Sequence, residues 1–129
     1  MRICSFAQES TRYCNYSDDK FGNEITVIQP YWINSDEVLQ EAWEDAIDFA
    51  EQAYIWFINT KKLSAQAARG VLPNDLKTEI NVKANLREWR QIFKLRTSPA
   101  AHPDMRRVMI PLLEELKTRI PVVFDDITV

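Results

Sequence analysis

The chain has 129 residues, of which 46% are hydrophobic and 27% are charged. This is the composition of a globular domain, so wholesale disorder is excluded. The formal net charge of −3 argues against bulk electrostatic binding, and we expect neither nucleic acid nor a membrane as a partner. With only two glycines, Gly22 and Gly70, the phosphate loops GxGxxG and GxxxxGK[ST] are excluded.

Cysteine and histidine are equally scarce. Cys4 and Cys14 are too few for a disulfide framework or a complete cysteine zinc site, and they favour a reducing compartment. His102 is the sole histidine, and no nucleophile motif surrounds it. No apolar run approaches the length of a membrane span. We therefore expect a soluble, cytoplasmic protein without a metal site.

The first 33 residues have little regular pattern. The segment SFAQESTRYCNYS, from Ser5 to Ser17, is polar and hydroxyl-rich and has neither helical nor strand periodicity. A loop that turns at Gly22 follows it. ITVIQPYWI, from Ile25 to Ile33, is apolar but broken by Pro30, which predicts an extended segment leading to a helix.

A long amphipathic helix is predicted from Val38 to Phe57, with Asn34 as its N-cap. Its apolar positions recur at spacings of three and four: Val38, Ala42, Ala46, Phe49, Ala53 and Phe57. The opposite face carries carboxylates, namely Glu41, Glu44, Asp45, Asp48 and Glu51. Such a row can resemble a metal site, but at this regularity it indicates a solvated helix face.

Two short elements come next. Ser64 can cap a helix through AQAARGV, which must end near Leu72 because Pro73 disfavours helical geometry in the residue before it. Arg69 falls in the last turn of that helix. From Leu76 to Ala84, apolar and polar residues alternate, which predicts a strand.

A basic helix is predicted directly after this strand. Asn85 can cap LREWRQIFKLR, a helix expected from Leu86 to Leu95, in which Arg87, Gln91 and Lys94 share one face. Residues 83–96 contain five cationic residues and one acidic residue, although the chain as a whole is acidic. Two interpretations are open: a solvated basic face, or a site for an anionic ligand where strand and helix meet.

The last predicted helix, PDMRRVMIPLLEELKTRI, spans residues 103–120 and is kinked at Pro111. Its buried side is expected to hold Met105, Val108, Met109, Leu112, Leu113, Leu116 and Ile120. VVFDDITV then forms a short tail, either an edge strand or a partner contact. The predicted fold class is α+β: one mostly helical domain over residues 1–129, with a short antiparallel sheet, a long amphipathic helix and a strand–helix unit at 76–96.

Three segments resemble the motifs of flavin-dependent thymidylate synthases. RICSFAQESTRY, from Arg2 to Tyr13, resembles the second part of the signature RHRxxSxNExSxR, with Arg2, Ser5, Ser10 and Arg12 on matching positions. RGVLP, from Arg69 to Pro73, resembles the segment ARxxLP. Residues 78–96 resemble TxxxxxxNxRxxxxFxxLR. Order and spacing agree over essentially the whole chain.

The resemblance implies the reductive methylation of deoxyuridine monophosphate (dUMP) to thymidine monophosphate (dTMP). In that family methylenetetrahydrofolate gives the carbon, and FAD, reduced by NADPH, gives the hydride without a covalent protein nucleophile. The reaction therefore belongs chiefly to the cofactor. The family also implies a homotetramer whose active site is assembled between chains.

The resemblance also assigns roles to individual residues. Those implied for dUMP are Gln8, Glu9, Ser10, Thr11, Arg12, Arg69 and Arg96. Ser10, Thr11, Arg12 and Arg69 would meet its phosphate. Arg96 is the implied catalytic residue, because a fixed cation at the uracil favours ionisation of its ring nitrogen. The residues implied for FAD are Arg2, Gln8, Asn85, Leu86, Arg87 and Gln91. Arg90 is placed away from this site.

Departures from the family pattern lead to a further expectation. Met1 stands where the signature has histidine, and Ala7 and Gln8 replace its asparagine and glutamate. The first arginine and the N-terminal half of the family are not in the sequence. We therefore expect a truncated form that is inactive alone. The alternatives are a non-catalytic nucleotide-binding remnant and a helical self-association module.

Overall fold

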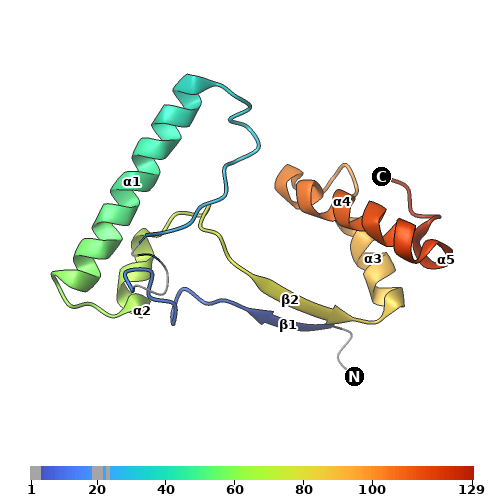
Figure 1. The fold of residues 1–129 in the computed structure, drawn as a ribbon, viewed down its shortest axis with the longest axis horizontal. Helices are drawn as coiled ribbons and strands as arrows, with labels where there is room; N and C mark the ends of the chain where they lie inside the picture. Colours follow the sequence, from blue (N-terminus) through green and yellow to red (C-terminus); the bar gives the residue numbers. More distant parts are fainter. Residues whose placement is uncertain (1–3, 19–21, 23) are drawn as a thin grey trace. The chain divides into compact units, whose positions relative to one another are not determined.

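The computed structural model describes residues 4–18, 22 and 24–129, which form two compact units (Figure 1). Unit 1 combines residues 4–7 with 81–129, and unit 2 is formed from residues 8–80. Each unit has its own hydrophobic core, and each is described by itself. The prediction that residues 1–129 form a single domain stays a prediction.

A two-stranded antiparallel sheet opens unit 1, as predicted for the fold class (Figure 1). Strand β1, Cys4–Gln8, pairs with β2, Ile80–Ala84, and the boundary to unit 2 falls at Gln8 and Ile80. The prediction that Ser5–Ser17 has no strand was wrong at its start. The side chains of β1 are exposed from Ser5 onward, so pairing with β2 forms the strand without apolar alternation.

The predicted strand Leu76–Ala84 is shorter in the structure. Only Ile80–Ala84 belongs to β2, while Leu76 forms an isolated antiparallel bridge with Val27. Backbone bonds on either side of this bridge join Lys77 N–H to the Thr26 carbonyl and Ile28 N–H to the Asp75 carbonyl, each at 2.8 Å. The alternating segment therefore pairs with two different partners in succession, which divides it.

Three helices complete unit 1: α3, Leu86–Arg96; α4, Pro103–Arg119; and α5, Pro121–Phe124. Their core consists of Phe93, Met109, Leu113, Phe124 and Ile127. The prediction of an edge strand for the tail was wrong, because residues 121–124 form α5 and Phe124 and Ile127 are buried in this core. The alternative prediction, a partner contact, stays a prediction. Along α4, the prediction was wrong for Met105, Val108 and Leu112, which are exposed.

Unit 2 contains the long helix α1, Glu37–Asn59, followed by α2, Ala65–Ala68, and a 3₁₀ turn, η2, Arg69–Val71. Ser64 caps α2 as predicted. The cap of α1 is Asp36, whose carboxylate accepts from the N–H groups of Val38 and Leu39, rather than the predicted Asn34. Asn34 has a φ of 42° and lies in the turn before the helix.

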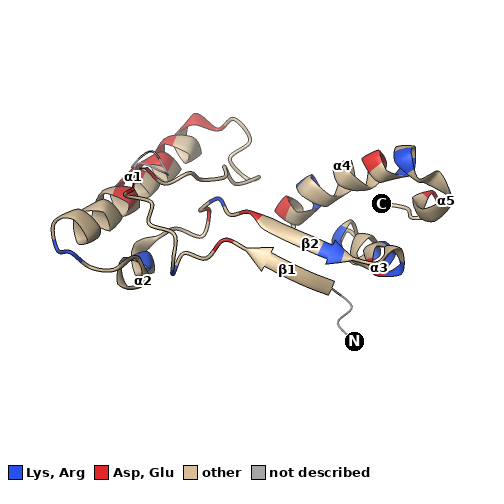
Figure 2. Ribbon diagram, turned by 60° about the horizontal axis from the view of Figure 1, so that its bottom comes forward, with Lys and Arg blue, Asp and Glu red and all other residues tan. Residues whose placement is uncertain are grey.

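The core of unit 2 is formed by Tyr16, Ile25, Tyr54 and Ala68. Acidic residues lie along α1 (Figure 2), and four of the predicted carboxylate face are exposed: Glu41, Glu44, Asp45 and Asp48. The prediction was wrong for Glu51, which is half-buried and accepts from the Ile25 N–H at 2.7 Å. Two residues of the predicted apolar stripe, Val38 and Phe49, are 75% and 77% exposed. Within unit 2, α1 therefore leaves part of its apolar surface uncovered. Among the described residues, no helix combines the length and apolarity that crossing a membrane requires.

Candidate functional site

An open pocket of about 490 Å³ lies within unit 2. It is lined by the loop after β1, by Arg69 of η2 and by the segment that follows η2: Gln8, Glu9, Ser10, Thr11, Arg69, Leu72, Pro73, Asn74, Leu76 and Thr78. The structure thus brings together five of the residues predicted to contact the nucleotide, although about sixty positions separate Arg69 from the others. The pocket offers hydroxyl groups, backbone amides and a guanidinium group.

The polar opening segment is held by contacts within unit 2. The Glu9 N–H donates to the Glu79 carbonyl at 3.0 Å, which fixes the start of the loop. The Ser10 carbonyl accepts from the N–H groups of Tyr13 and Cys14, at 2.9 and 3.0 Å. These bonds fold residues 10–14 into a tight turn, so Ser10 and Thr11 are presented to the pocket by a defined backbone.

Tyr54 anchors the other end of this turn. Its ring is fully buried in the core, and its hydroxyl accepts from the Tyr16 N–H at 3.4 Å and donates to the Cys14 carbonyl at 3.5 Å. Burial is the main cause that raises the pKa of Tyr16 to about 12, and it raises the pKa of Tyr54 as well. Both hydroxyl groups therefore stay protonated at neutral pH, and that of Tyr54 holds the turn through its two hydrogen bonds.

The opposite wall of the pocket is tied to α1 through Asp75. The Asp75 carboxylate accepts from Trp43 Nε1 at 2.8 Å, and Trp43 lies on α1. Earlier in the same segment, the Leu72 N–H donates to the Arg69 carbonyl at 3.1 Å and thereby closes η2. Sequence reasoning missed both Asp75 and Trp43, because no motif links residues 32 positions apart. These contacts fix the segment from which Pro73, Asn74 and Leu76 line the pocket.

The two arginines predicted at the phosphate differ in their surroundings. Arg69 lines the pocket, and its guanidinium group has no hydrogen-bond or ion-pair partner among the described residues. Arg12 is not among the residues that line the pocket. Its Nε donates to Gln66 Oε1 at 2.7 Å, and its guanidinium carbon lies 5.2 Å from the centre of the Tyr13 ring.

Four of the six residues predicted for the flavin lie at or on α3, in unit 1. Asn85 caps the helix as predicted, because its side-chain oxygen accepts from the Glu88 N–H at 2.9 Å. Leu86, Arg87 and Gln91 are all exposed, and the last two lie four residues apart on one helical face. Gln8 lies in unit 2, at the pocket, and Arg2 lies outside the described residues.

Arg96, the predicted catalytic residue, is the exposed last residue of α3. The next residue, Thr97, is fully buried and fixes the helix end: its hydroxyl donates to the Phe93 carbonyl at 2.8 Å. The Thr97 carbonyl in turn accepts from Arg106 Nε at 3.1 Å. The backbone that carries Arg96 is therefore held from both sides of the helix end, while the residue itself is exposed.

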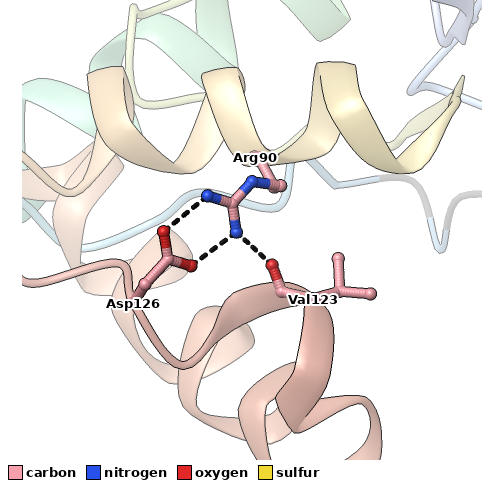
Figure 3. A network of polar contacts seen from close by, with 3 residues as sticks. All are labelled: Arg90, Val123 and Asp126. Atoms are coloured by element: carbon pink, nitrogen blue, oxygen red, sulfur yellow. Dashed lines mark hydrogen bonds and ion pairs between the residues drawn. The ribbon is translucent and has the colours of Figure 1, made fainter.

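Among the five cationic residues of the segment 83–96, Arg90 has a structural role (Figure 3). Its two terminal nitrogens donate to the two carboxylate oxygens of Asp126, each at 2.6 Å, and one of them also bonds the Val123 carbonyl. Bonding to this guanidinium lowers the pKa of Asp126 to about 2. The remaining cations of residues 83–96 are Lys83, Arg87, Lys94 and Arg96, all of them exposed.

Burial and the nearby Glu88 carboxylate raise the pKa of the Cys4 thiol, which keeps it protonated. Among the residues that the structure describes, no three His, Cys, Asp or Glu side chains cluster as metal ligands. The arrangement is suited to binding anions through fixed hydroxyl, amide and guanidinium donors.

The chain matches a known protein family over most of its length. The model of the thymidylate synthase complementing protein family matches residues 1–122. The chain belongs to this family. The match covers both units and ends before Val123, so the part of the core formed by Phe124 and Ile127 lies outside it.

Relatives of this chain include flavin-dependent thymidylate synthases of two bacteria. The protein of Corynebacterium efficiens is 33% identical over 142 residues, and that of Mycobacterium tuberculosis is 32% identical over the same length. Each alignment covers 99% of this chain and 54% of the relative. The chain therefore spans about half the length of the curated relatives it matches.

Solved structures agree in fold. A crystal structure of flavin-dependent thymidylate synthase from Helicobacter pylori, complexed with FAD and dUMP, has a TM-score of 0.64 at 18% identity. The alignment covers 99% of this chain and 64% of the Helicobacter pylori chain. A second structure of the Helicobacter pylori enzyme, with the same two ligands, has a TM-score of 0.62 at 19% identity. At this level of identity the similarity shows the fold.

Proposed function

We propose that the protein acts in flavin-dependent thymidylate synthesis, the reductive methylation of dUMP to dTMP with methylenetetrahydrofolate and NADPH. One observation carries the proposal: the pocket of about 490 Å³ gathers Gln8, Glu9, Ser10, Thr11 and Arg69. Of these, Ser10 and Arg69 fall on matching positions of two separate family motifs, and the chain belongs to the corresponding family. Chemistry and family membership thus point to the same site.

In this proposal the pocket of unit 2 binds dUMP. Arg69 supplies a planar fork that meets two phosphate oxygens and stays charged at any physiological pH. Its lack of a carboxylate partner among the described residues supports this role, because no internal ion pair has to be broken. Ser10 and Thr11 add hydroxyl donors from the tight turn. Arg12 is a second cation for the phosphate.

Arg96 is proposed as the catalytic residue. A guanidinium group beside the uracil stabilises the negative charge that develops on the ring during the reaction. Thr97 and Arg106 fix the backbone next to it, which limits the freedom that Arg96 must lose on binding. FAD, when bound, supplies the hydride.

The start of α3 fits an anionic cofactor such as FAD. The first turn of a helix presents free N–H groups and the positive end of the helix dipole, which favour a pyrophosphate. Arg87 is exposed and has no ion-pair partner among the described residues, and Gln91 lies one turn further along. We propose that Asn85, Leu86, Arg87 and Gln91 hold the cofactor, and Gln8 is included because the family resemblance implies it. Arg2 is included on its motif position alone.

We further propose that the chain forms a homo-oligomer. The exposed apolar side chains of α1, including Val38 and Phe49, would be costly to leave in water as one continuous patch. A tetramer is the family expectation. The cytoplasmic location predicted from the two cysteines also stays a prediction.

Isothermal titration with dUMP tests the proposed function. Replacing Arg69 by alanine should weaken dUMP binding roughly 10- to 100-fold, the range for hydrogen bonds to charged groups, and should leave folding unchanged. Arg119→Ala is the matched control, because it removes an exposed arginine that pairs only locally with Glu115. Arg90 is unsuitable as a control, since it binds Asp126.

A second titration, with FAD, separates the proposed enzyme from a nucleotide-binding protein without catalysis. The pocket lies wholly within unit 2, so dUMP binding does not depend on the cofactor residues of α3. Binding of both ligands supports the synthase, and binding of dUMP alone supports the non-catalytic alternative. Binding of neither ligand, or equal effects of Arg69→Ala and Arg119→Ala, would refute the proposed dUMP site.

A further inference from the structure

Gln66 on α2 makes the one side-chain contact that holds Arg12 to another segment among the described residues. Its Oε1 accepts from Arg12 Nε at 2.7 Å, across 54 positions of sequence. The face of the Tyr13 ring, at 5.2 Å, supports the same guanidinium group from its own turn. Two contacts of different kinds therefore restrict a side chain that would otherwise sample many rotamers.

The choice of nitrogen matters for what Arg12 can bind. A guanidinium group has five N–H donors, one on Nε and four on the two terminal nitrogens. Gln66 occupies Nε alone, and the terminal nitrogens have no partner among the described residues. The edge formed by these two nitrogens meets phosphate oxygens in a bidentate manner. Gln66 thus fixes the side chain and leaves this edge available.

Gln66 is also well placed relative to the pocket. Helix α2 runs directly into η2, so Gln66 and Arg69 lie three residues apart, on neighbouring positions of one helical face. Arg69 lines the pocket, as do Ser10 and Thr11, which precede Arg12. One helical segment therefore carries one arginine and holds a second, which comes from the facing loop.

The amide character of residue 66 has an electrostatic consequence. A carboxylate at this position would pair with Arg12 and cancel the charge that attracts a phosphate. A neutral amide accepts the same hydrogen bond and leaves the positive charge intact. Since neither Arg12 nor Arg69 has a carboxylate partner among the described residues, both keep their charge for a ligand.

We propose that Gln66 is a positioning residue for phosphate binding, which orients Arg12 so that its terminal nitrogens meet the phosphate of the nucleotide. This inference rests on the proposed function. Gln66 does not line the pocket, and none of the three sequence motifs contains it. Its role would be indirect, through Arg12. Because the contact is made without ligand, part of the ordering cost is met before the nucleotide binds.

A double-mutant cycle on dUMP affinity tests the inference. Gln66→Ala should weaken dUMP binding about 3- to 10-fold, as expected when one hydrogen bond that orients a charged group is lost. In the Arg12→Ala background, Gln66→Ala should have no further effect, because Gln66 acts through Arg12. Gln66→Glu should bind dUMP more weakly than Gln66→Ala. The matched control is Gln52→Ala, an exposed glutamine of α1.

The outcomes distinguish this inference from the proposed function. If the unmodified protein does not bind dUMP, the proposed function fails. If it binds dUMP, and Gln66→Ala and Gln52→Ala have the same dUMP affinity, the inference is wrong while the proposed function stands. A loss that persists in the Arg12→Ala background, with the same melting temperature, would also overturn it. Tighter binding by Gln66→Ala would show that Gln66 restrains Arg12 away from the phosphate.

Discussion

Thr97 places a polar side chain in the interior of unit 1, one residue after the proposed catalytic Arg96. Its hydroxyl donates to the Phe93 carbonyl at 2.8 Å and thereby reinforces the last turn of α3. Thr97→Val keeps the shape of the side chain and removes this bond, so it should lower the free energy of unfolding by about 1 kcal/mol. Urea denaturation measures the change, and Thr97→Ser, which retains the hydroxyl, is the control. Unchanged stability in Thr97→Val would contradict this interpretation.

Asp126 makes the stability of unit 1 dependent on pH. Its pKa is lowered from 3.8 to about 2 by the bond to Arg90, so the folded state favours the charged carboxylate. A lowered pKa stabilises the fold at pH values above the unfolded pKa, and this stabilisation disappears as pH falls through the folded pKa. Asp126→Asn should therefore be less stable than the original chain at pH 7.

The difference in the free energy of unfolding between Asp126→Asn and the original chain should disappear between about pH 4 and pH 2, because Asp126 becomes protonated in the original chain. Denaturation curves at a series of pH values measure it. A difference that stays constant down to pH 2 would show that the pairing with Arg90 does not depend on the charge of Asp126.

At the scale of elements, the short helix α5 joins the tail to the core of unit 1. Phe124 is buried and meets the Phe93 ring edge-on, with 5.6 Å between ring centres. Phe124→Ala leaves a cavity at this contact and should cost about 3–5 kcal/mol of stability. Val122→Ala is the matched control on the same helix, because Val122 is 93% exposed. Chemical denaturation should show a large loss for the first variant and a change within about 0.5 kcal/mol for the second.

The helices were predictable from sequence because their information is local. Apolar spacing and the caps Ser64 and Asn85 indicated α1, α2, α3 and α4. β1 and α5 were missed, since each is too short to show a period and depends on partners distant in sequence. The cap of α1 was misplaced at Asn34 because several polar residues precede the helix, and only the backbone turn selects Asp36.

In the candidate site as well, some residues could be predicted from the sequence and others could not. Gln8, Glu9, Ser10, Thr11 and Arg69 were named from motifs, and the structure places them around one pocket. Trp43, Tyr54, Gln66 and Asp75 support this pocket or its arginines, and they could not be found from sequence. Each acts through one or two hydrogen bonds to residues far along the chain. A supporting contact of this kind leaves no local pattern of spacing or composition.

At the scale of the whole molecule, the two cores should respond separately to mutation. The core of unit 1 contains Leu113, and that of unit 2 contains Tyr54, and the two clusters share no residue. Leu113→Ala should therefore speed hydrogen exchange of amides in α3 and α4 and leave those of α1 nearly unchanged. Native-state hydrogen exchange, read by mass spectrometry of peptides, measures both helices at once. Equal acceleration in α1 would show that the molecule opens as one cooperative unit.

The division of unit 1 into two sequence segments affects how the chain is made. β1 is synthesised before unit 2, but its partner strand β2 follows unit 2, and its core is closed only by Phe124 and Ile127. Since ribosomes add about 5–20 residues per second, the wait from Gln8 to Ile127 is roughly 6–24 s. Unit 2 has its whole sequence after Ile80 and can fold during this interval. The unpaired β1 segment meanwhile leaves Phe6 and two strand edges open to wrong pairing until β2 has been made.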